Sequence, residues 1–69
     1  MADRKVDSTY FLYEKLIQQK NITTYRVCKD TGVTNTVISQ WKRGISKPKL
    51  ENLIKIASYL GVSINYFIA

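Results

Sequence analysis

The fold of this chain is decided by residues 22–44, which read ITTYRVCKDTGVTNTVISQWKRG. Thr23 or Thr24 is a good N-cap for a short helix, because its side-chain oxygen can accept a hydrogen bond from a backbone N–H of the first turn. Gly32 can adopt the left-handed backbone angles of a tight turn. Thr34 is the matching N-cap for a second helix. The stretch therefore predicts two short helices joined by a glycine turn.

These two helices are expected at about residues 24–31 and 35–43, with Gly44 ending the second. Two short helices around a glycine turn are the sequence form of a helix-turn-helix, here at about residues 24–43, whose second helix can enter the major groove of DNA. The chain also has eleven Lys and Arg against five Asp and Glu, a net charge of +6. The motif and the charge together favour a nucleic-acid partner.

Length and composition exclude several classes of function. A chain of 69 residues makes one domain and is too short for a deep catalytic cleft. The 45% apolar content is typical of a globular domain. The chain has no histidine and one cysteine, Cys28, which excludes a zinc finger, a Ser-His triad and an internal disulfide. We therefore expect no enzyme, no metal site, no cofactor and no small-molecule ligand.

The sequence carries no membrane signal. No apolar run approaches the roughly 20 residues needed to span a bilayer. The N-terminal residues MADRKVDSTYF lack the apolar centre of a signal peptide. The expected location is the cytoplasm, in association with the nucleoid.

The remaining segments also read as helices. Residues 1–7 are polar and are expected to form a loose arm before a single domain at 8–69, with Asp7 or Ser8 as cap of a helix running to about Lys20. On that helix one face is shared by Thr9, Tyr13, Leu16 and Ile17, with Tyr10 at its margin.

A fourth helix is expected at about residues 49–60 and a last short one at 64–68, capped by Ser63. The inward stripe predicted for the fourth helix is Leu50, Leu53, Ile54, Ala57 and Leu60. Every expected element is a helix and every connection is short. The sequence therefore predicts an all-α fold, a compact five-helix domain around a central helix-turn-helix.

The helix at 35–43 has two unlike faces when its residues are spaced at about 100° on a helical wheel. Ile38 and Trp41 lie on one side, which places Trp41 in the core rather than on a surface for base stacking. The other side carries short hydrogen-bonding groups and no acid. The residues predicted to read base edges are Asn35, Thr36, Val37, Ser39 and Gln40. Asn and Gln can pair with adenine through two hydrogen bonds. The alternative interpretation is an ordinary solvated helix face.

Basic residues surround the end of this helix, with no acid between Asp30 and Glu51. Such groups set the register on DNA and provide most of the salt-dependent affinity by contacting phosphates. The predicted phosphate contacts are Thr23, Thr24, Lys42, Arg43, Lys47 and Lys49. The two threonines are included because a helix N-terminus presents free amides to an anion. The alternatives are a solvated charge run and ordinary helix capping.

From Tyr13 onward the chain resembles the lambda repressor and Cro type of helix-turn-helix, the XRE family. The resemblance rests on Leu16, Ile17, Ile22-Thr23, Val27-Cys28, Gly32-Val33-Thr34, Ile38, Trp41, Gly44, Pro48, Leu50, Leu53, Ile56-Ala57 and Leu60-Gly61-Val62-Ser63. It implies a lambda-repressor-like domain that binds operator DNA as a twofold dimer. It also implies that Asn35, Thr36 and Gln40 occupy base-reading positions, with Thr24 near phosphate and Arg43 and the following loop at the backbone.

Four residues depart from the family pattern. Cys28 stands where an alanine is usual, Lys42 where many members have an acid, Lys49 where a capping serine follows the proline, and Asn65 where an aspartate is common. None of them removes a DNA-contact position.

The sequence thus predicts a sequence-specific transcriptional regulator, a repressor of phage, prophage or mobile-element type in a prokaryotic setting. Double-stranded DNA is the expected partner, together with a second copy of the chain. The candidate dimer contacts are Ile64, Tyr66, Phe67 and Ile68. The alternative is a protein-interaction module of antitoxin or anti-repressor type. Steep salt dependence of binding would favour DNA. Whether Phe11 faces a partner or is half covered is left open by the pattern.

Overall fold

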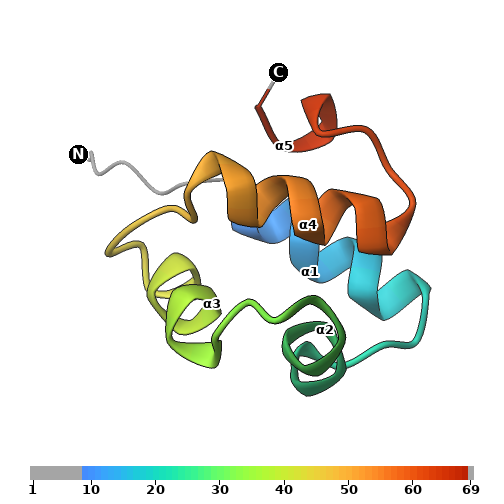
Figure 1. Ribbon diagram of the computed structural model, residues 1–69, viewed down its shortest axis with the longest axis horizontal. Coiled ribbons are helices and arrows are strands. Elements are labelled where there is room, and N and C mark those ends of the chain that lie inside the picture. Colours follow the sequence, from blue (N-terminus) through green and yellow to red (C-terminus); the bar gives the residue numbers. More distant parts are fainter. Residues whose placement is uncertain (1–8, 69) are drawn as a thin grey trace.

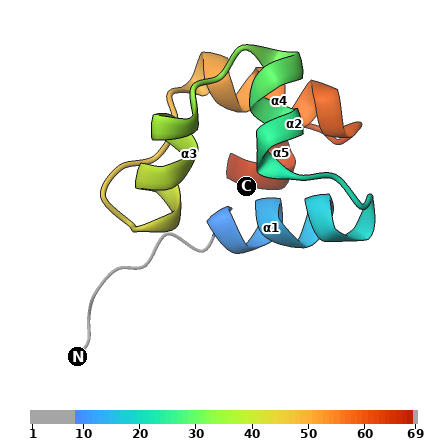
Figure 2. The ribbon, with the colours of Figure 1, turned by 90° about the horizontal axis from the view of Figure 1, so that it is seen from below.

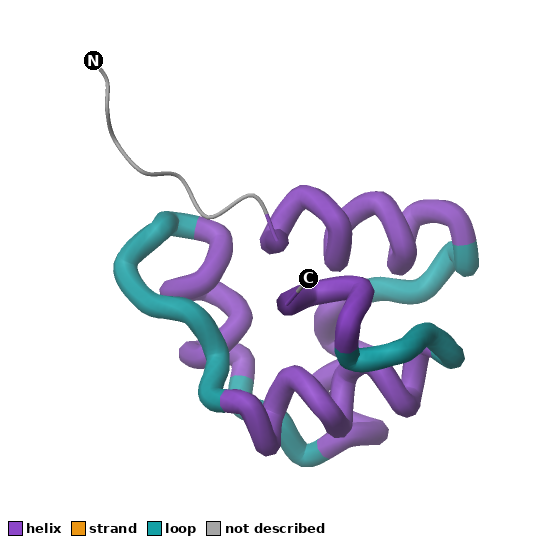
Figure 3. Tube along the Cα trace, turned by 90° about the horizontal axis from the view of Figure 1, so that it is seen from above, coloured by secondary structure: helices purple, strands orange, loops and turns teal. Residues whose placement is uncertain are grey.

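The computed structural model describes residues 9–68, and the regular elements in that range are all α-helices (Figure 1). They are α1 (Thr9–Gln19), α2 (Thr24–Thr31), α3 (Asn35–Lys42), α4 (Leu50–Leu60) and α5 (Asn65–Ile68). The path between them consists of short loops (Figure 3). The expected five-helix, all-α fold is confirmed. The expected arm at 1–7 and its capping residues Asp7 and Ser8 lie outside the described residues.

The helices enclose one core. α1 packs against α5, α2 against both α3 and α4, and α4 against α5. Figure 2 shows α1 and α4 on opposite sides of the domain, with α5 between them. In Figure 1, α2 and α3 lie on one side of α4 and α5 lies on the other. The helix-turn-helix and the last helix are therefore on different sides of the molecule.

The core is built around Trp41, whose side chain is 1% exposed. Its ring lies against three other aromatic rings, those of Tyr10, Tyr13 and Phe67, at centroid distances of 5.6, 5.2 and 5.9 Å. Its indole Nε1 donates to Thr9 Oγ1 at 3.1 Å. The expected place of Trp41 in the core is confirmed.

The predicted inward stripe of α4 is wrong at two positions. Leu50 is 57% exposed and Ile54 is 48% exposed, whereas Ile56 is fully buried. The buried stripe is Leu53, Ile56, Ala57 and Leu60. Both stripes obey the helical period, so the periodicity alone did not choose between them. The packing of α4 on two sides, against α2 and α5, selected the one that contains Ile56.

The two threonine caps and the glycine turn form as expected. Thr23 Oγ1 accepts from the N–H of Arg26 at 3.2 Å, and Thr34 Oγ1 accepts from the N–H of Val37 at 3.4 Å. Gly32 has φ 84°, and its N–H donates to the Cys28 carbonyl at 2.9 Å. A non-glycine residue would be strained at that φ, which explains why the turn between α2 and α3 needs glycine.

A polar contact joins α2 to α4. The Tyr59 hydroxyl donates to Asp30 Oδ2 at 2.5 Å, and Arg26 Nε lies 3.2 Å from the same oxygen. The hydrogen bond from Tyr59, with the smaller effect of Arg26, holds the pKa of Asp30 below its ordinary value of 3.8. The same bond raises the pKa of Tyr59 above 10.0. The contact thus favours a charged Asp30 and a neutral Tyr59.

Replacing Tyr59 with Phe is expected to raise the pKa of Asp30 and to weaken the fold in a pH-dependent way. Because the folded-state pKa of Asp30 is depressed, its stabilising effect is present above the unfolded value of 3.8 and is lost as pH falls through the lower folded value. Urea midpoints of the wild type and Tyr59→Phe should therefore differ near neutral pH and converge in acid. Tyr25→Phe, at an exposed tyrosine, is the control. A constant difference down to about pH 2 would contradict this role.

Candidate nucleic-acid interface

One face of α3 points away from the core and carries most of the predicted base-reading residues. Ile38 and Trp41 are buried on the inner face. Asn35, Thr36 and Ser39 are exposed, whereas Val37 and Gln40 are half-buried. Val37 packs against the core, so it presents less surface than its neighbours. The major groove of DNA is wide enough for an α-helix, and a polar outer face can hydrogen-bond to the base edges there.

The loop after α3 folds back over the last turn of the helix. Gly44 has φ 76°, and its N–H donates to the Trp41 carbonyl at 3.1 Å. The N–H of Ile45 donates to the Gln40 carbonyl at 2.9 Å. This pair of bonds is a Schellman motif, which satisfies carbonyls that the helix leaves without partners. It brings the loop residue Ser46 beside the side chain of Gln40.

The side chain of Gln40 is held from that loop. Ser46 Oγ donates to Gln40 Oε1 at 3.1 Å. Ser46 was not among the sequence-predicted site residues. A serine in a loop gives no periodic signal, and its contact with Gln40 depends on how Gly44 turns the chain.

A set of exposed cations borders the polar face of α3. Its members are Lys42, Arg43, Lys47 and Lys49. Lys47 and Lys49 also line a hollow of about 360 Å³ between α3 and the start of α4, together with Gln40 and Ser46. No acid lies between Asp30 and Glu51 in the sequence, and Glu51 is the acid that lines the same hollow as Lys47 and Lys49. The structure thus brings two of the predicted base-reading residues, Val37 and Gln40, together with Lys47 and Lys49.

The start of α2 presents amides rather than free hydroxyls. The Thr23 hydroxyl oxygen caps the helix, and the Thr24 hydroxyl shares a hydrogen bond of 2.8 Å with Tyr13. Burial raises the pKa of Tyr13 to about 12, so this phenol stays neutral. The N–H groups of Thr24 and Tyr25 lie at the first turn, where no intrahelical acceptor exists. Contact with an anion here would therefore use the backbone more than the two side-chain hydroxyls.

The last helix is only partly available as an interface. Phe67 is 1% exposed and packs against Trp41, so its assignment as a dimer contact is wrong. A helix as short as α5 is held in place by packing against the core, and Phe67 makes that contact. Ile64 is half-buried, while Tyr66 and Ile68 remain exposed.

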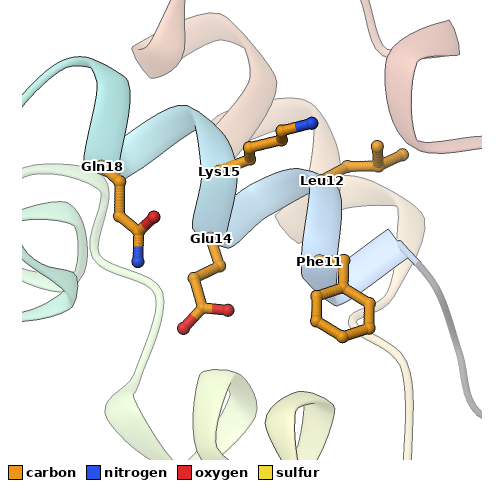
Figure 4. A pocket seen from close by; sticks show the side chains of 5 residues that line it. All are labelled: Phe11, Leu12, Glu14, Lys15 and Gln18. Carbon is orange, nitrogen blue, oxygen red and sulfur yellow. The ribbon is translucent and has the colours of Figure 1, made fainter.

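A second hollow lies along α1. Phe11 is 65% exposed, so it is open to solvent or a partner rather than half covered. It borders a hollow of about 310 Å³ together with side chains from the same helix, shown in Figure 4. Glu14 and Lys15 both line it, so side chains of both charge signs border this hollow.

The described part of the chain offers neither a metal site nor a membrane span. Among these residues, no three or more His, Cys, Asp or Glu side chains are grouped to hold a metal ion. None of the helices within residues 9–68 is both long and apolar enough to cross a bilayer.

Comparison with known proteins assigns the chain to a family. A family described as helix-turn-helix matches residues 12–67. An uncharacterized HTH-type transcriptional regulator of Haemophilus influenzae is 45% identical over 38 residues, which are 55% of this chain and 16% of that relative. The chain thus spans less than a fifth of the relative's length. No solved structure matches the chain. On the family match, which covers most of the chain, this protein belongs to the Cro/C1-type (XRE) helix-turn-helix family.

Proposed function

We propose that the chain is a sequence-specific DNA-binding regulator of transcription, with no enzymatic activity, that reads an operator through α3. The observation that carries this proposal is the outer face of α3, where hydrogen-bonding side chains without an acid adjoin four exposed cations. Family membership and the transcriptional regulator from Haemophilus influenzae support it.

The residues divide into two roles on DNA. Asn35, Thr36, Ser39 and Gln40, with a smaller part for Val37, would contact base edges in the major groove. The cations after α3 and the first amides of α2 would contact phosphates and set the register. This division predicts which substitutions change sequence preference and which change only affinity.

The finer proposal is a cytoplasmic repressor of phage, prophage or mobile-element type that binds a pseudo-palindrome as a dimer. Two reading helices of such a dimer would lie about 34 Å apart, one turn of DNA. Tyr66 and Ile68 on α5 are the proposed dimer contacts, with a part for Ile64. Because α5 lies across the domain from α2 and α3 (Figure 1), a contact there leaves the face of α3 free for DNA.

The decisive experiment is selection from a pool of random duplexes at moderate salt, followed by sequencing. We expect a motif with two half-sites centred about one DNA turn apart. Gln40→Ala is expected to relax one position in each half-site, with a loss of about 1–3 kcal/mol for the preferred base. Gln19→Ala, at an exposed glutamine on α1, is the matched control. Weak, salt-sensitive binding without a motif would refute base reading and direct the search to protein partners.

The dimer is tested separately by gel filtration with light scattering, on the free protein and on its complex with the selected duplex. We expect two copies on the two-half-site duplex. Ile68→Glu places a charge on the exposed part of α5 and should lower the cooperativity of binding without unfolding the domain. A single copy on the full duplex at high protein concentration would contradict the dimer.

A further inference from the structure

We propose that Ser46 is a positioning residue that sets which base Gln40 prefers, by holding the carbonyl oxygen of the Gln40 side chain. This inference rests on the proposed DNA-reading function of α3. Its basis is the hydrogen bond from Ser46 Oγ to Gln40 Oε1, 3.1 Å long, at the edge of the predicted reading face.

Backbone hydrogen bonds of the loop place Ser46 beside Gln40. Ile45 and Ser46 both direct their N–H groups to the Gln40 carbonyl, at 2.9 and 3.4 Å. Gly44 makes this possible through its positive φ of 76°. Gln40 is itself half-buried, and it lines the same hollow as Val37 and the loop residues Ser46 and Lys47. The same helix end that closes α3 therefore places a hydroxyl donor against one particular side chain.

Holding the carbonyl oxygen changes what Gln40 offers to DNA. A free glutamine presents one acceptor and one NH₂ group, which match the N6 donor and N7 acceptor of adenine. When Ser46 donates to Oε1, that oxygen is turned toward the loop, and the NH₂ group is left to face outward. The outward edge then consists of donors.

A donor edge selects a different base. Guanine presents two acceptors in the major groove, N7 and O6, whereas adenine presents one acceptor and one donor, and cytosine presents a donor. The orientation set by Ser46 thus favours guanine over adenine at the position that Gln40 reads. Without Ser46, the side chain can rotate and the adenine pairing becomes available.

The test is the same duplex selection carried out with the wild type, Ser46→Ala, Ser46→Thr and Gln40→Ala. The position read by Gln40 is the one whose preference disappears in Gln40→Ala. We expect the wild type to prefer guanine there, and Ser46→Ala to shift the guanine-to-adenine ratio by about threefold to tenfold, the worth of one hydrogen bond. Ser46→Thr keeps the hydroxyl and should keep the wild-type ratio. Ser58→Ala, at an exposed serine of α4, is the matched control.

The outcomes separate this inference from the function on which it rests. If the wild type selects no motif, the proposed function fails and the role of Ser46 falls with it. If a motif appears and responds to Gln40→Ala but not to Ser46→Ala, base reading stands and the role of Ser46 is overturned. A wild-type preference for adenine at that position also overturns it.

A measurement on the free protein tests the contact without DNA. The side-chain Nε2 amide signals of Gln40 in a nitrogen–proton NMR spectrum should move and narrow in Ser46→Ala, because the carboxamide gains freedom. They should stay close to the wild-type positions in Ser46→Thr. Unchanged Gln40 side-chain signals in Ser46→Ala would overturn the proposal whatever the protein binds.

Discussion

Trp41→Ala is expected to lower the free energy of unfolding by about 3–5 kcal/mol, which is a large part of the stability of a domain this small. The indole is almost fully buried and is the side chain on which Tyr10, Tyr13 and Phe67 converge. Its removal leaves a cavity that the rings of Tyr10 and Tyr13 on α1 and of Phe67 on α5 cannot fill. It also leaves Thr9 Oγ1 without the Nε1–H donor.

Urea unfolding followed by far-ultraviolet circular dichroism measures this loss. Trp41→Phe is the informative companion, since it keeps an aromatic ring but cannot donate to Thr9; it should lie between the wild type and the alanine variant. Tyr25→Ala removes an aromatic side chain that is exposed on α2 and should change stability by less than about 0.5 kcal/mol. If Trp41→Ala unfolds at the same urea concentration as Tyr25→Ala, the aromatic cluster does not hold the fold.

Replacing Lys42, Arg43 and Lys47 simultaneously by glutamine is expected to weaken DNA binding by roughly a hundredfold at physiological salt. All three are exposed at the end of α3 or in the loop that follows it. The slope of log affinity against log salt is negative, and each phosphate that the protein no longer neutralises makes it shallower by about 0.9. The slope should therefore become shallower by about 2.7. Lys49 is left unchanged because it is also the N-cap residue of α4.

The control is a variant with glutamine at Lys15, Lys29 and Lys55, which are exposed on other helices. Both variants have three fewer positive charges than the wild type, so both change the overall attraction to DNA equally. Fluorescence anisotropy with the selected duplex over a range of salt concentrations separates general attraction from direct contact. Equal slopes for the two variants would show that the basic end of α3 has no special place on the phosphates. The selected motif itself should be the same for both, since phosphate contacts carry no sequence information.

Local patterns predicted most of the helices well. Thr23, Thr34 and Gly32 act within one or two helical turns of their own positions. Their effects therefore depend only on residues close by in the sequence. The two-faced character of α3 followed in the same way from spacing, with Trp41 inside. The part of the fold that depends on neighbours in the chain could therefore be predicted from the sequence.

Two errors have a common physical origin. The choice between Ile54 and Ile56 for the inner face of α4 depends on the helices that pack against it, which lie elsewhere in the sequence. Phe67 was placed on a surface because it ends a short terminal helix. Its ring is instead drawn into the core by Trp41, 26 positions earlier in the chain. Contacts of this kind have no local period and no fixed spacing.

By itself, the sequence determined the helix-turn-helix, its caps, its basic surroundings and the polar composition of its outer face, because capping, helical period and charge are local properties of a chain. Only the tertiary structure decided that Phe67 belongs to the core, that Ile56 rather than Ile54 is buried, and that Ser46 holds the carboxamide of Gln40. Each of these depends on how a turn or a packed helix brings distant atoms within a few ångströms, where hydrogen bonding and burial act.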